Sequence, residues 1–124
     1  MASITKRLYR AAERYPPADR EYRTSADRGR VLPSDASEEQ RRSWDALSAW
    51  ETEEAAMAVA CGSMSARFVV SFDIPEVCFG AQDACGITCE PSGEPGHFDI
   101  RGDMEELKRY LSDVRVDVER RNRR

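Results

Sequence analysis

The chain has 124 residues, of which 40% are hydrophobic and 34% are charged, and its net charge is -4 at neutral pH. This length is sufficient for one domain with a buried core. The composition excludes a disordered chain, and the apolar runs are far shorter than the roughly 20 residues of a membrane-spanning helix. The sequence therefore predicts one domain over residues 1–119 with a basic tail at 120–124, and no membrane partner.

The N-terminal stretch MASITKRLYR has no apolar segment of the kind found in secretory signals, so we expect a cytoplasmic protein. Cysteines in that compartment are expected to be reduced thiols, and the chain has four, Cys61, Cys78, Cys85 and Cys89. The acidic net charge argues against nucleic acid as a partner, although the tail RRNRR forms a local basic patch. A solvated chain end is the simpler interpretation of that tail.

The first half of the chain predicts a strand, a charged segment, a helix, a second strand and a second helix. The first strand is KRLYR (6–10), which ends before Pro16 and Pro17, and the segment 18–33 is a loop or short helix dense in charge. Ser37 and Gln40 have the spacing of a capping box and predict a helix to about Ala46. LSAW (47–50) reads as a short strand, and Thr52 caps a helix over 53–61.

The second half predicts more strands than helices. ARFVVSFDIP (66–75) alternates like a strand, 76–96 reads as loop with at most a short strand at 87–89, and HFDI (97–100) is another strand. Asp103 caps a helix whose buried stripe is Met104, Leu107 and Leu111. VRVDVE (114–119) is a last strand whose valines are expected to face inward. The predicted helices are few and do not alternate regularly with the strands, which indicates an α+β fold around a mostly antiparallel sheet.

The common catalytic and metal-binding motifs are absent from the sequence. Zinc would accept Cys78, Cys85, Cys89 and His97 as ligands, but their spacing does not match the usual paired ligands, so small buried side chains are the simpler interpretation and no metal site is predicted. His97 is the single histidine, and no GxSxG surrounds Ser48. Neither GxGxxG nor a P-loop is present.

Three stretches, in chain order, carry a resemblance to a known superfamily. LYR (8–10) places an arginine on the first strand, LSAWETEEAA (47–56) a serine on a strand before a helix, and GHFDIRG (96–102) a polar residue at the start of a late strand. In this order they resemble the small ADP-ribosyltransferase-like fold, in which the late strand begins with a glutamate followed by an aromatic, an aliphatic and a glycine. The resemblance covers about half of the chain and implies a split sheet with a few flanking helices.

The resemblance implies roles for individual residues. Arg10 would hold the phosphates or a ribose of NAD, because a guanidinium makes forked bonds to phosphate, and Ser48 would position the nicotinamide-side ribose, with Trp50 as a further cofactor-binding candidate. His97 stands where the family has its catalytic glutamate, and an imidazole does not supply the negative charge that stabilises an oxocarbenium-like centre. His97 and Ser48 are the catalytic candidates.

Each candidate also has a purely structural interpretation. Arg10 would be a surface arginine, Ser48 a residue facing a helix start, and His97 a hydrogen-bonded structural residue. Trp50 would be an anchor in the core or at its rim.

Three hypotheses for function remain. The first is an NAD-consuming enzyme, performing ADP-ribosyl transfer or NAD cleavage like a small effector or toxin that acts on a protein target. The second is a catalytically inactive module of the same fold that binds a nucleotide or a protein. The third is an interaction protein that acts through the charged segment 20–30.

Overall fold

The computed structural model describes residues 4–80 and 86–118, which form one α+β domain around a six-stranded antiparallel sheet. The strand order is β4-β5-β2-β1-β3-β6. The strands are β1 (Thr5–Ala12), β2 (Leu47–Trp50), β3 (Phe68–Pro75), β4 (Ile87–Pro91), β5 (His97–Gly102) and β6 (Leu111–Asp117). The helices are α1 (Glu38–Ser43), α2 (Glu53–Gly62) and α3 (Met104–Lys108), with short 3-10 turns η1 (Asp19–Tyr22) and η2 (Glu76–Cys78). The predicted α+β class is confirmed.

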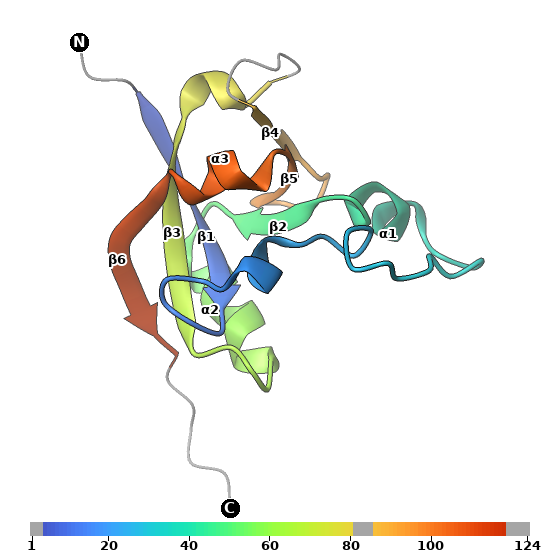
Figure 1. Cartoon of the computed structure of the whole chain (residues 1–124), viewed down its shortest axis with the longest axis horizontal. Helices are drawn as coiled ribbons and strands as arrows, with labels where there is room; N and C mark the ends of the chain where they lie inside the picture. The colour runs from blue at the N-terminus through green and yellow to red at the C-terminus, as the bar shows by residue number, and fades with distance from the viewer. Residues whose placement is uncertain (1–3, 81–85, 119–124) are drawn as a thin grey trace, which may run out of the picture.

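The two faces of the sheet are covered by different parts of the chain. On one face, Leu8, Phe72 and Ile100 form the larger core with Tyr22 of η1 and Leu107 of α3. Figure 1 shows α3 and the segment after β1 crossing in front of the strands. On the opposite face, the small residues of α2 pack against β1 and β3, with Ala56, Ala60 and Val69 buried. Small side chains let the helix lie close to the sheet.

The sheet is weakly joined in its middle. β1 pairs with β3 along its whole length, from Thr5 opposite Pro75 to Ala12 opposite Phe68. The pairing of β1 with β2 consists of one residue pair, Tyr9 opposite Trp50. Strands β4, β5 and β2 therefore form one half of the sheet, and β1, β3 and β6 form the other. This one residue pair joins the two halves.

The helix starts agree with the capping residues seen in the sequence. The Ser37 hydroxyl accepts from the Gln40 N–H at 3.1 Å, and the Gln40 side chain accepts from the Ser37 N–H at 2.9 Å. Thr52 accepts from the Ala55 N–H at 3.2 Å, and Asp103 accepts from the Glu105 N–H at 2.9 Å. These capping interactions satisfy backbone donors that the first helical turn leaves unpaired.

Several predicted boundaries and faces are wrong. β1 extends to Ala12, and α1 ends at Ser43 because the chain turns there to enter β2. The last helix ends at Lys108, so Leu111 starts β6. Val114 is 53% exposed and does not face inward, whereas Val116 and Val118 pack against the smaller core.

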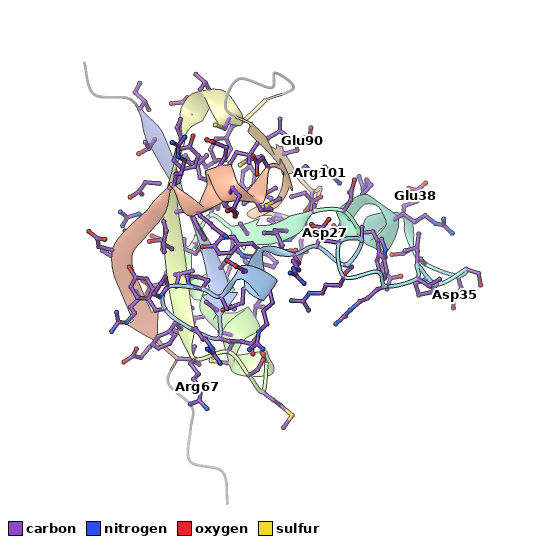
Figure 2. All side chains as sticks on the ribbon, in the orientation of Figure 1. Asp27, Asp35, Glu38, Arg67, Glu90 and Arg101 are labelled. Atoms are coloured by element: carbon purple, nitrogen blue, oxygen red, sulfur yellow. The ribbon has the colours of Figure 1, made fainter. Side chains whose placement is uncertain are left out.

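Two of the expectations concern residues that the structure does not describe. The basic tail at 120–124 and Cys85 lie outside the described residues. No helix in residues 4–80 and 86–118 combines the length and the apolar character needed to cross a membrane. Asp35 and Glu38, in the loop before α1 and at its start, extend away from the sheet (Figure 2).

Candidate functional site

Arg10 lies on the β1 face that carries the larger core, between Leu8 and Ala12. Its guanidinium donates to the backbone carbonyl of Ser48 through Nη1, and to the carbonyl of Glu21 through Nη2 at 3.4 Å. The first bond fills the gap where β1 and β2 separate, so a side chain replaces a backbone ladder bond there. Burial lowers the pKa of Arg10 to about 10, with Arg28 adding to this effect and the Tyr22 and Glu21 groups opposing it. Arg10 therefore remains charged at neutral pH.

Ser48 lies on the opposite face of the sheet from Arg10 and is exposed. It pairs with Asp99 of β5, so the two side chains share a face. Arg10 contacts the Ser48 carbonyl and not its hydroxyl.

His97 is buried at the start of β5, where it pairs with Trp50. The ring centroids of His97 and Trp50 are 4.5 Å apart, and His97 Nδ1 lies 2.6 Å from the Ser92 hydroxyl. The Ser92 hydroxyl also accepts from the Glu94 N–H at 3.3 Å, which fixes the turn between β4 and β5. The cavity beside His97 has a volume of about 40 Å³, close to the roughly 30 Å³ of one water molecule. This space is too small for a nucleotide.

The structure brings some of the predicted site residues together and separates others. Ser48, Trp50 and His97 share one face of neighbouring strands, with Trp50 against the imidazole. Arg10 projects from the other face, because successive side chains of a strand point to opposite sides and Tyr9, its neighbour, pairs with Trp50. The four residues therefore do not line one cavity.

The face of β5 that carries His97, Asp99 and Arg101 is polar but mostly enclosed. Asp99 is buried and accepts from the Ser43 hydroxyl at 3.0 Å. Arg101 pairs with Asp45 at 3.0 Å and with Glu90 at 3.7 Å, and it lies beside Glu90 in Figure 2. These groups hold α1 and β4 to the sheet.

A pocket of about 220 Å³ lies at the end of β1, where Arg10 is joined by Arg23 and Arg28. Ser63 and Ser65, which follow α2, line its other side. It combines three guanidinium groups with two hydroxyls, which are the donors that proteins use to bind phosphate.

The two carboxylates that line the same pocket already have partners. Glu21 is buried and accepts from the backbone N–H groups of Glu13 at 2.6 Å and Ala18 at 2.7 Å. Glu13 pairs with Arg20 at 3.3 Å. The lining therefore contains three guanidinium-bearing and two carboxylate-bearing residues, which leaves one net positive charge.

The sequence drew attention to Arg23 and Arg28 only as members of the charged segment 20–30. A pattern of charge along a loop does not predict which side chains meet the end of a distant strand. η1 brings this segment to β1, because Tyr22 is buried in the core and forms an edge-to-face contact with Phe72 at 6.3 Å between ring centroids.

The cysteines differ from expectation. Cys78 is disulfide-bonded, so the prediction of four reduced thiols is wrong for this residue. Cys89 is a buried thiol, and burial raises its pKa to about 12. Within residues 4–80 and 86–118, no group of His, Cys, Asp and Glu side chains is arranged to hold a metal ion.

Comparison with known protein families, with curated proteins and with solved structures finds no match to this chain. The site must therefore be interpreted from its own geometry.

Proposed function

We propose that the chain is a binding module for a phosphate-bearing ligand of the nucleotide class, held at the arginine pocket formed by Arg10, Arg23, Arg28, Ser63 and Ser65. The single observation that supports this is that three arginines line one hollow in a protein whose net charge is -4. An anion is the ligand class that such a site favours.

Arg10 is suited to the central role because it is already held in position. Its two bonds to backbone carbonyls use two of the five N–H groups of a guanidinium, and the remaining donors are available for a ligand. Fixing a donor before the ligand arrives reduces the conformational entropy lost on binding. Arg23 and Arg28 are exposed and can close on the bound anion.

The size of the pocket supports a partial enclosure of the ligand. A volume of about 220 Å³ is below the roughly 300–1,000 Å³ of sites that enclose a whole small molecule. The pocket therefore accommodates the phosphates, and the base and ribose would lie on the surrounding surface. NAD, which the resemblance implies, and ADP are the nucleotides to test first.

Binding without turnover is the form of this proposal that the geometry favours. His97 and Ser48 lie on the opposite face from Arg10, and the His97 imidazole is enclosed by Trp50 and Ser92. A group that contributes to chemistry must reach the reacting atoms, and from that face neither side chain reaches a ligand held by Arg10.

The test is calorimetric titration at low salt with inorganic phosphate, ADP and NAD, using the wild type, Arg28→Met and Arg30→Met. Loss of one charge-assisted bond costs about 1.5–3 kcal/mol, so Arg28→Met should weaken ADP binding tenfold or more. Arg30→Met is the matched control, because Arg30 is exposed in the same segment and does not line the pocket. Equal affinity of the wild type and Arg28→Met, or no binding of any of the three probes, would overturn the proposal.

Incubation of the protein with NAD, followed by measurement of free nicotinamide, separates the two nucleotide hypotheses. We expect no release above that of buffer alone. Release that is lost in His97→Ala would instead support the NAD-consuming enzyme.

A further inference from the structure

A second and larger hollow lies at the other end of β1, on the same face of the sheet as Arg10. Its volume is about 810 Å³, within the range of roughly 300–1,000 Å³ typical of small-molecule sites. Among the described residues it is lined by Lys6, Glu76, Phe79, Gly80, Cys89, Glu90, Pro91 and Phe98. The arginine pocket shares none of these residues.

The inner part of this hollow is aromatic and uncharged. The Phe79 and Phe98 rings meet edge to face with centroids 5.6 Å apart. Cys89 lies beside them as a buried thiol, and it is uncharged at neutral pH because burial raises its pKa to about 12. The rings and the neutral thiol provide an apolar surface.

The charged groups around these rings favour a cation. The Lys6 ammonium lies 4.6 Å from the Phe98 centroid and 5.4 Å from that of Phe79, so one positive charge already occupies the π-faces. Glu76 is exposed and lines the pocket, so its carboxylate is available to a cation, whereas the Glu90 side chain points to the other face of β4 and pairs with Arg101 at 3.7 Å. Lys6 also lies 3.6 Å from Glu51, which gives its ammonium a second partner if it leaves the rings.

We propose that this pocket binds a small organic ammonium ion, which displaces the Lys6 side chain from the Phe79 and Phe98 rings. In the free protein Lys6 acts as an internal substitute for the ligand. On binding, the Lys6 ammonium leaves the rings and keeps its ion pair with Glu51, and the ligand cation takes its place over the rings with Glu76 nearby. The ligand's apolar part lies against Phe98 and Cys89.

Choline is the probe, and 3,3-dimethylbutan-1-ol, its uncharged counterpart of the same shape, is the control ligand. Binding is followed by chemical-shift titration of the wild type, Lys6→Met, Phe98→Leu and Glu76→Gln. A cation–π contact contributes about 0.5–2 kcal/mol, so Phe98→Leu should weaken choline binding about twofold to thirtyfold. Lys6→Met should strengthen choline binding, because it removes the ammonium that competes for the rings. Glu76→Gln should weaken choline binding, because it removes a nearby negative charge.

The control variant is Lys108→Met. Lys108 also places its ammonium over a ring, 5.2 Å from the Tyr22 centroid, but it does not line this pocket, so choline affinity should not change. Lys6 and Glu76 are at accessible positions, so these two variants remain informative if Phe98→Leu does not fold. The proposal is overturned if the uncharged alcohol binds as tightly as choline, if Lys6→Met weakens choline binding, or if choline does not bind the wild type.

Discussion

Replacing Arg10 with methionine tests whether this side chain holds the two halves of the sheet together. Methionine preserves most of the aliphatic volume and removes the guanidinium, so the carbonyls of Ser48 and Glu21 lose their charged donor. Each such bond contributes about 1.5–3 kcal/mol, which gives about 3–6 kcal/mol for the pair. The other arginine variants, Arg23→Met and Arg28→Met, remove no bond of this kind between β1 and β2.

A second effect of the substitution opposes the first. Burial lowers the pKa of Arg10 from 12.5 to about 10, and each unit corresponds to about 1.4 kcal/mol, so about 3 kcal/mol of desolvation cost is relieved when the charge is removed. The net expectation is a loss of about 0–3 kcal/mol in the free energy of unfolding. Because β1 and β2 share one residue pair, Tyr9 with Trp50, amide exchange at these two residues should accelerate more than exchange in β3.

The assay is urea unfolding combined with hydrogen exchange. Arg67→Met is the control, since the Arg67 side chain is exposed and points away from the sheet (Figure 2). If exchange at Trp50 is the same in Arg10→Met as in Arg67→Met, Arg10 does not join the two halves, whatever the difference in urea midpoint.

Three further predictions concern other parts of the fold. Cys89 should resist iodoacetamide at pH 8 while the exposed Cys61 reacts, because burial raises the Cys89 pKa to about 12. Mass spectrometry of the treated protein should find the Cys89 thiol unmodified. The hydrogen bond from Arg7 lowers the Asp73 pKa below 3.8 in the folded protein, so the ionised Asp73 stabilises the fold above that pH. This stabilisation is lost as the pH falls through the folded pKa. Asp73→Asn should therefore lose less stability than the wild type when the solution is acidified. Ala60→Leu should cost about 1–3 kcal/mol in thermal or urea unfolding, because Ala60 is fully buried between α2 and the sheet.

Each of these has a contrary result. Rapid labelling of Cys89 in the folded protein would mean that its surroundings open readily. An acid unfolding profile of Asp73→Asn identical to that of the wild type would remove any role for its ion pair. An Ala60→Leu variant of unchanged stability would show that α2 does not lie tightly on the strands.

Local patterns predicted much of the secondary structure. The capping residues Ser37, Thr52 and Asp103 were identified because a cap depends on side chains within three or four positions along the chain. The strand at β3 was evident from its alternation, but both of its faces are covered. Val69 and Ser71 are therefore buried along with Phe72, which alternation with a polar face does not predict.

The candidate site was less accessible to prediction, since its residues depend on long-range packing. Arg10, Ser48 and His97 lie on three neighbouring strands, but the pairing of Tyr9 with Trp50 sends Arg10 to the opposite face. One residue of register decides this, and register is set by which side chains the core accepts. The arginine pocket likewise exists only because burial of Tyr22 brings the charged segment to the end of β1.

The sequence by itself determined the class of the fold, the helix starts and the central strands, because these follow from propensities and contacts between near neighbours. Only the tertiary structure decided which face each polar side chain occupies and which arginines meet. Those outcomes depend on strand register and on the burial of distant hydrophobic residues, and a local pattern contains neither.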